Sequence, residues 1–547
     1  MVVTGLMGSG GVVEAGGAHG APSVRVVAPS APGGELERDD LPPPQLEVVK
    51  HPVEIDAPAI PAFDLPATAP GVRSPRELRV RGHRTLGSEI KVAGYVTWIY
   101  DCRQELATAN PEATPDQITR AIRDDATLCQ RPMFLLGDAR NTPRDRSVLV
   151  VEAAAMPRLA VGDPAIVVGT WSRQPPHAEF SDGALIYKAL EPAAAAGTAH
   201  DALPAPREIA IELDGAASPP LRRIVDETTI NSSIAHLNAC NKANAAKHFD
   251  AAIAECHSAT AIWHDNHLAW YATASAHLAK RQWPEARAAI DNAVVLRPDL
   301  AMYQLYLGIA LYESERQRVR DVQARREHKR PDEVELDPTL LRLDAARDAL
   351  ARAVKLVPEL WRAHYYLGRI YRDLDDAQRA AAEFTQTIKS HPGYRFAYIA
   401  LSELYRRWDY LDQALAVAVL GAGRVAAPDS AELWFEAGMA HQARHADDRA
   451  IDAFSRAIAA GDLPSKLQRG QVYLHKRDLA AARRDLEDVV RAPDADAAAA
   501  RQLAGQLLQE IASTRNAAAA RDTRWDCRRT RELLVCHPRA LPSGARD

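Results

Sequence analysis

The sequence predicts a multidomain protein: an all-α superhelical solenoid, preceded by a small all-β barrel and a disordered N-terminal segment. Three observations support this. A pattern of small and apolar residues recurs about every 34 residues between 233 and 496, five short β-rich runs lie between 78 and 192, and Gly, Ala and Pro dominate residues 1–77. At 547 residues the chain also exceeds what one hydrophobic core usually covers.

The composition is that of an ordinary soluble protein. Charged residues make up 25% of the chain and the formal net charge is −5, so we expect no global attraction to nucleic acid or anionic lipid. No apolar run reaches the roughly 18 residues of a membrane-spanning helix. The N-terminus lacks a positively charged leader, and six cysteines are too few for a disulfide scaffold. We therefore expect a cytoplasmic protein.

Three segments have little to bury. Residues 1–77 are predicted to be disordered, residues 193–230 form an Ala/Pro-rich linker, and residues 516–547 form an Arg-rich C-terminal tail. The folded units are therefore expected at 78–192 and 231–515.

Residues 78–192 are predicted to form the small barrel. Five runs rich in β-branched and aromatic residues are separated by turn signals; they are Ile90–Tyr100, Met133–Leu136, Ser147–Val151, Ala165–Trp171 and Ala184–Tyr187. An insert at 101–132 carries a predicted helix through 117–122, capped at Thr114.

The barrel resembles an OB-fold in the stretch Val161–Gly169, where a tight turn feeds a strand that ends at a glycine. The resemblance implies a nucleic-acid-binding alternative, with Tyr95, Trp98 and Trp171 as stacking candidates. Charge weighs against it, because residues 76–192 hold 15 basic and 15 acidic side chains.

Cys102 and Cys129 stand at the two ends of the insert. If the barrel is correct, both lie at the mouths of adjacent strands, where a disulfide would pin the insert. Two unrelated thiols in a reducing cytoplasm remain the alternative.

The repeat is clearest in Trp361–Pro392. Laid along the chain, its frame starts seven units near 233, 267, 301, 361, 395, 431 and 463. Where two helices of a unit cross, only small side chains let the backbones approach. The two crossing slots of the seven units hold Cys240 and Ala252, Ala274 and Ala286, Gly308 and Ala346, Gly368 and Ala380, Ser402 and Ala414, Gly438 and Ala450, and Gly470 and Ala482.

With these residues, the stretch 233–496 resembles the tetratricopeptide repeat family. The resemblance implies pairs of antiparallel helices stacked into a superhelix, and residues 496–513 are expected to cap its end. Cys240 falls in a crossing slot, and Cys256 falls in the apolar stripe slot, four residues after the second small residue of its unit, so we interpret both as buried small residues.

The resemblance also implies a concave groove lined by the first helix of each unit. In units four and five the groove positions are Arg362, Tyr365, Arg369, Arg372, Phe396, Ile399, Glu403 and Arg406. We expect such a surface to bind an extended or helical peptide that carries carboxylates. The alternative is a solvated face whose arginines pair with neighbours such as Asp373, Asp375 and Asp376.

Unit three carries an insertion at about 316–341 that is rich in arginine. We expect it to prolong the helix beyond Tyr312 and to return after Pro331. It is interpreted as a solvated helical extension, with contact to nucleic acid or an acidic partner as the alternative.

The sequence lacks the common catalytic and metal-binding motifs, so we expect no enzyme, no cofactor and no metal site. The prediction is a non-enzymatic scaffold whose groove binds a segment of a partner protein, which we expect to be acidic. Partner identity and oligomeric state are not predicted.

Overall fold

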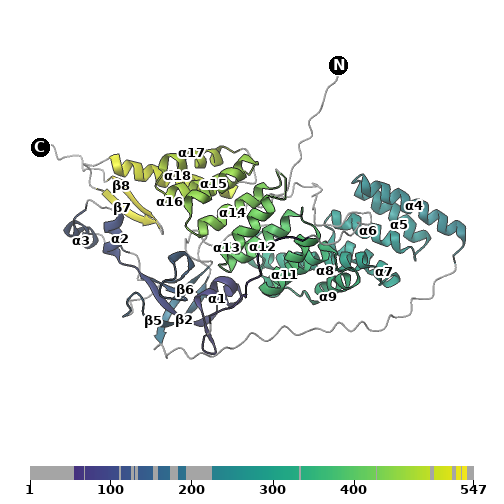
Figure 1. The fold of residues 1–547 in the computed structure, drawn as a ribbon, viewed down its shortest axis with the longest axis horizontal. Helices are drawn as coiled ribbons and strands as arrows, with labels where there is room; N and C mark the ends of the chain where they lie inside the picture. Colours follow the sequence, from purple (N-terminus) through teal and green to yellow (C-terminus); the bar gives the residue numbers. More distant parts are fainter. Residues whose placement is uncertain are drawn as a thin grey trace, which may run out of the picture.

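The computed structural model consists of a helical array with a β-barrel beside it (Figure 1). It describes residues 54–66, 68–109, 113–124, 129, 133–151, 158–172, 183–191, 225–331, 334, 336–426, 428–462, 464–492, 498–519, 525–530 and 533–538. The array comprises α4 (Glu227–Ala245), α5 (Phe249–Ile262), α6 (His267–Ala279), α7 (Trp283–Leu296), α8 (Ala301–Glu327), α9 (Asp344–Leu356), α10 (Trp361–Asp373), α11 (Ala377–Ser390), α12 (Arg395–Arg407), α13 (Leu411–Ala422), α14 (Ala431–Ala443), α15 (Asp447–Ala459), α16 (Pro464–His475), α17 (Leu479–Arg491) and α18 (Ala498–Ala519).

These helices form the seven predicted pairs and the cap, which confirms the solenoid. The first unit begins six residues earlier than expected, at Glu227, and α18 continues beyond 513 to Ala519. The fourteen crossing-slot residues are all buried. The glycine in unit four is required by close approach, because a Cβ on Gly368 would lie 2.6 Å from the Phe384 ring.

The barrel contains the five expected strands: β2 (Glu89–Ile99), β3 (Phe134–Gly137), β4 (Val148–Val151), β5 (Pro164–Ser172) and β6 (Ala184–Glu191). They follow the order β2-β3-β4-β6-β5, and a β2–β5 pairing closes the sheet. The β4–β6 pairing is parallel and the others around the barrel are antiparallel. A closed five-stranded barrel agrees with the OB-like expectation.

The insert holds the expected helix and one more. Helix α3 (Pro115–Asp124) begins at the predicted Thr114 cap, where the Gln117 amide and side chain bond reciprocally with Thr114. An additional helix, α2 (Cys102–Ala109), precedes it.

The prediction of disorder over 1–77 is wrong for its last part. Residues 54–66 pack against the array, β1 (Val72–Arg73) pairs with β2, and α1 (Pro75–Arg81) follows, leading into the 3-10 turn η1 (Gly82–Thr85). Apolar residues such as Ile55 and Phe63 lie among the prolines and alanines and are buried, which the composition of the segment does not indicate. Residues 1–53 and most of the 193–230 linker lie outside the described residues.

Helix α1 joins the two folded units. Leu78 belongs to the barrel core, whereas Val80, two residues later, belongs to the core of the array. Figure 1 shows the barrel beside the middle of the array and away from α4 to α7. The N-terminal module, by which we mean the described residues of 54–191, is therefore docked onto the central units.

The C-terminal tail contains a backbone hairpin, β7 (Trp525–Thr530) with β8 (Leu533–Pro538), where the sequence predicted only a tail. Among the described residues, no helix combines the length and apolar character needed to cross a membrane.

Candidate functional site

The eight predicted groove residues lie on α10 and α12, and we call them the inner-helix wall. Most of them have little solvent exposure: Arg362, Tyr365, Arg369, Ile399 and Arg406 are each at most 8% exposed. The other three, Arg372, Phe396 and Glu403, are half-buried. The wall is therefore not the solvated, arginine-rich surface that the sequence alone suggests.

Two of its arginines form buried ion pairs with adjacent units. Arg369 Nη1 lies 3.1 Å from Glu313 Oε1 on α8, and Arg406 Nη2 lies 3.0 Å from Glu436 Oε2 on α14. All four side chains are at most 6% exposed. The carboxylates that these arginines need are therefore supplied by the array itself.

The remaining two arginines differ from this pair. The Arg372 side chain is 29% exposed, and its guanidinium lies 3.6 Å from Asp373 and 4.0 Å from Glu403. The Arg362 guanidinium stacks 4.1 Å from the centre of the Trp361 ring. Arg372 is thus the arginine of the wall that solvent reaches best.

Burial of the wall's acidic partners changes their protonation. Burial, together with the Glu403 carboxylate, raises the pKa of Glu436 to about 7 despite the nearby charge of Arg406. Burial likewise raises the pKa of Glu432 to about 7, against the lowering effect of Arg395. Both carboxyls therefore titrate close to neutral pH.

A second surface lies at the turns that join the two helices of units four to six, which we call the turn edge. Of the non-glycine residues with positive φ in the described turns, two are acidic, Asp375 (φ 58°) and Asp409 (φ 61°). They are 34 residues apart and occupy the same slot of units four and five, where aspartate tolerates the left-handed conformation. The same slot is held in other units by Lys247, Arg281, His445 and Arg477.

Arginines of the N-terminal module cap the helix ends at this edge. Their guanidinium groups donate hydrogen bonds to backbone carbonyls at or next to the C-termini of α10, α12 and α14, where the helix dipole favours cations. The bonds run from Arg84 to Leu374 (3.0 Å), from Arg81 to Asp375 (3.0 Å), from Arg76 to Trp408 (2.5 Å) and from Arg146 to Ala443 (3.2 Å).

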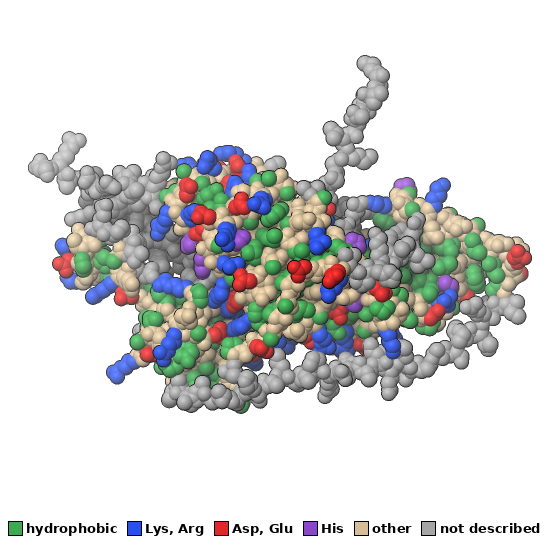
Figure 2. Space-filling model, in the orientation of Figure 1, with side chains coloured by type: hydrophobic (Ala, Val, Ile, Leu, Met, Phe, Trp, Pro, Cys, Tyr) green, Lys and Arg blue, Asp and Glu red, His purple; other side chains and the backbone are tan. Residues whose placement is uncertain are grey.

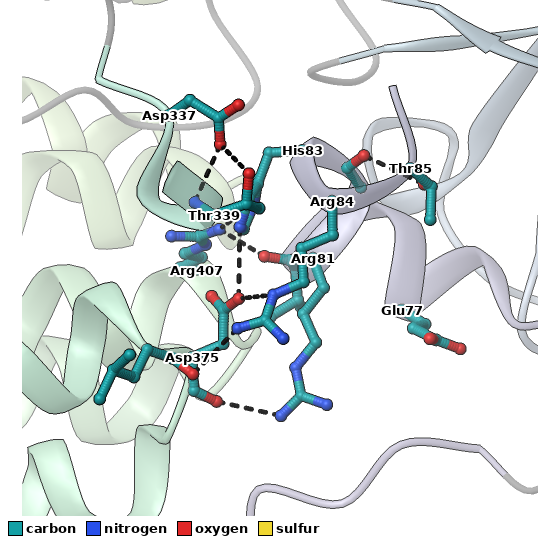
Figure 3. Close-up of polar contacts among 12 residues, drawn as sticks. Glu77, Arg81, His83, Arg84, Thr85, Asp337, Thr339, Asp375 and Arg407 are labelled. Atoms are coloured by element: carbon teal, nitrogen blue, oxygen red, sulfur yellow. Dashed lines mark hydrogen bonds and ion pairs between the residues drawn. The ribbon is translucent and has the colours of Figure 1, made fainter. Parts of the chain in front are cut away.

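The two aspartates complete the contact. Figure 3 shows the Asp375 carboxylate facing Arg84 and His83, whose Nε and Nε2 atoms lie 2.5 and 3.2 Å from its Oδ2. Burial alone would raise the pKa of Asp375, but His83 and the positive charges of Arg407 and Arg84 outweigh it and hold that pKa below its usual value. Asp409 pairs in the same way with Arg79.

The stacking candidates of the nucleic-acid alternative are not grouped on one open face. Trp171 is 1% exposed in the barrel core. Tyr95 and Trp98 are half-buried and lie under the guanidinium groups of Arg140 and Arg144. Figure 2 shows basic and acidic side chains interspersed over the visible face of the molecule.

The insertion in unit three prolongs α8 to Glu327, as expected from the sequence. Its first arginine, Arg316, is paired 2.7 Å from Asp373, and Arg318 is paired with Glu315. The basic residues at its tip, Arg325 and the residues that follow, are exposed. The insertion is thus partly a packing element of the array.

The structure joins the cysteines of the described units in two disulfides. Cys102 is bonded to Cys129 at the base of the insert, and Cys240 is bonded to Cys256 between α4 and α5. Cys240 and Cys256 are fully buried, as interpreted from the sequence, and the disulfide that joins them is an additional feature that the sequence analysis does not predict. The crossing slot of Cys240 on α4 faces the stripe slot of Cys256 on α5, and the two helices are close enough there for the bond.

Comparison with known proteins gives one family match. Residues 271–317 and 340–395 match the family model described as tetratricopeptide repeat. Among curated protein sequences, none matches this chain.

Solved structures with similarity to this chain include three proteins. MamA is 19% identical, with 36% of this chain and 92% of that chain covered and a TM-score of 0.29. A thermophilic TPR protein of Thermus thermophilus is 22% identical, with 38% and 98% covered and a TM-score of 0.29. YrrB, a TPR protein with an unusual peptide-binding site, is 18% identical, with 35% and 90% covered and a TM-score of 0.26.

Proposed function

We propose that the protein is a non-enzymatic scaffold that holds a segment of a partner protein on its inner-helix wall, because its helical array includes the residues that match the tetratricopeptide repeat model. The observation that carries this proposal is the seven-unit solenoid itself. Stacked helix pairs present an extended surface to which each unit contributes the same few positions.

The contacts of the wall residues support a choice of which residues would contact a partner segment. Arg369 and Arg406 are already neutralised by Glu313 and Glu436, so they position the helices rather than bind a carboxylate. The half-buried Arg372, Phe396 and Glu403 remain accessible. A partner segment would place an apolar side chain on Phe396 and an acidic or amide group at Arg372.

The test is capture of partners from a lysate of the native host by the full-length protein, followed by cross-linking to α10 and α12. The double variant Arg372→Ala with Phe396→Ala is expected to lose the cross-linked partner. Arg287→Ala, on the outer helix α7 with a half-exposed side chain, serves as the matched control and is expected to capture normally. Undiminished capture by the double variant would remove the wall assignment.

A further inference from the structure

The ordered segment 54–66 lies on the array like a bound peptide. Its apolar side chains face the array, and Ile55 and Phe63 are 7% and 8% exposed within the same buried cluster as the central helices. Asp56 and Asp64 face solvent. This in-and-out alternation is that of an extended chain docked by one face.

Phe63 is the anchor of the segment. Its ring centre lies 6.0 Å from that of Tyr405, 5.2 Å from that of Trp408 and 5.4 Å from that of Tyr410. All three rings come from the end of α12 and the turn after it, and we call them the aromatic box. The Arg76 guanidinium of α1 also lies 5.9 Å from the centre of the Trp408 ring and 5.2 Å from that of Tyr410. An aromatic side chain that fills a desolvated pocket is the usual centre of a peptide interface.

Side chains rather than backbone hold the segment. Within residues 54–66, the backbone contact with the array is the bond that the Tyr410 hydroxyl donates to the Ala62 carbonyl. The other backbone bond of the segment is internal, from the Ala57 amide to the Ile55 carbonyl. No ladder of the kind that fixes a sheet strand ties these described residues to the array.

We propose that segment 54–66 is a tethered ligand, and that the aromatic box of unit five is a second binding site for a partner chain of the same chemistry. That partner is an extended, proline-containing segment with one aromatic anchor and solvent-facing carboxylates. The tether gives the internal copy an effective concentration of the order of millimolar, so an outside peptide must displace it. The box shares no residue with the inner-helix wall, so the two assignments are tested by different variants.

The probe is a fluorescent synthetic peptide of residues 54–66, and the protein is the full chain. Phe63→Ala empties the box, so this variant is expected to bind the peptide at least about tenfold more tightly than the unmodified protein. Asp64→Ala is the matched control: its side chain faces solvent, and it is expected to behave as the unmodified protein.

Two further measurements keep the test decisive. Trp408→Ala combined with Phe63→Ala removes one ring of the box and is expected to abolish the increase in peptide affinity. Circular dichroism checks that the helix content is unchanged. A peptide carrying alanine in place of its phenylalanine is expected not to bind. If Phe63→Ala binds the peptide no better than the unmodified protein, or binds the two peptides equally, the segment is a fixed structural strap and the proposal fails.

A separate observation concerns the cysteines. All four cysteines of the barrel insert and of unit one are in disulfides, and the hairpin register places the two remaining ones, residues 527 and 536, directly opposite each other. Disulfides persist in oxidising compartments and are rare in the cytosol.

We infer that this chain folds and works in an oxidising compartment, contrary to the cytoplasmic expectation. Each bond forms when two thiols lose two protons and two electrons to a disulfide-bearing oxidant, which is reduced to a dithiol. The bonds link separate helices or the ends of an insert, so they restrain local opening of the units that contain them.

The test is a thiol count on protein taken from its native host, with acid quenching and alkylation before and after reduction. Cys102, Cys129, Cys240 and Cys256 are expected to be unmodified before reduction and alkylated after it. Alkylation of either pair before reduction would overturn the inference.

Discussion

The inner-helix wall and the turn edge both use α10 and α12 but satisfy their charges differently. On the wall, Arg369 and Arg406 pair with Glu313 and Glu436 of adjacent units. On the edge, the Asp375 side chain faces His83 and Arg84, about 290 residues away in the sequence. The wall is thus completed within the repeat, whereas the edge is completed by another domain.

This difference indicates which charges stabilise the array and which position the N-terminal module. A charge whose partner lies in the next unit is fixed by the stacking that also forms the core, so it contributes to stability and little to recognition. A charge whose partner belongs to a separate module positions that module. We expect the two surfaces to respond differently to mutation, pH and salt.

The largest effect is expected from breaking a wall pair. Arg406→Ala leaves the Glu436 carboxylate buried without its partner, which should cost about 3–5 kcal/mol in the free energy of unfolding. Denaturant unfolding followed by circular dichroism measures it.

A double replacement separates charge from packing. Arg406→Met with Glu436→Leu keeps the buried volume and removes both charges, and it is expected to restore most of the lost stability. If the double variant is as unstable as Arg406→Ala, the ion pair is not what the single change removed.

The next effect is on the pH dependence of the free energy of unfolding, and the sign of that dependence differs between the two surfaces. The pKa values of Glu432 and Glu436 are raised to about 7 in the folded protein, so folding takes up protons and the free energy of unfolding falls as pH rises from about 4.5 to about 7. The slope is about 1.4 kcal/mol per pH unit for each proton taken up. The folded-state pKa of Asp375 is lowered, so its contribution is present above pH about 4 and is lost below that.

Denaturation curves at pH 5 and pH 7.5 measure this dependence. Glu436→Gln, which cannot ionise, is expected to reduce the slope between these values by roughly half. A slope that is unchanged in Glu436→Gln would show that the wall carboxyls do not titrate in this range.

A smaller and more local effect is expected at the edge. Asp375→Asn keeps a residue that tolerates positive φ but removes the charge facing His83 and Arg84, at about 1.5–3 kcal/mol of docking free energy. Backbone amides of α1 should then exchange with deuterium about 10- to 100-fold faster, while those of α14 do not change. Arg477→Asn, in the same turn slot of unit seven, is the control; accelerated exchange of α1 there would contradict the assignment.

The sequence predicted what the repeat period controls and missed what depends on distant segments. Small residues such as Gly368 and Ala380 occupy slots that geometry dictates, so the helix pairs followed from spacing alone. The eight wall residues lie on α10 and α12, the first helices of their units, as the repeat frame predicts. The burial of Arg369 and Arg406 does not follow from the frame, because their partners Glu313 and Glu436 lie one unit away.

The docking surface could not be predicted because nothing local marks Phe63 as buried among prolines and alanines. One signal was present: aspartate occupies the left-handed turn slot in units four and five, where other units carry basic or histidine side chains. That contrast could have identified the edge, since the residues of α1 that face it are arginines.

The smallest effect is expected at the rim of the edge. Arg79 and Asp409 are 13% and 21% exposed, compared with 6% and 3% for Arg406 and Glu436. Arg146 also lies 3.9 Å from Asp409 and is unchanged in the variant, so Arg79→Ala should cost about 1 kcal/mol of docking free energy. Because screening acts on accessible charges, the exchange difference between Arg79→Ala and the unmodified protein should disappear in 1 M salt, where the Debye length is about 3 Å. The stability difference caused by Arg406→Ala should persist in the same salt, because that pair is buried. Equal salt dependence of the two would mean that wall and edge are not distinguished by burial, and the comparison itself would fail.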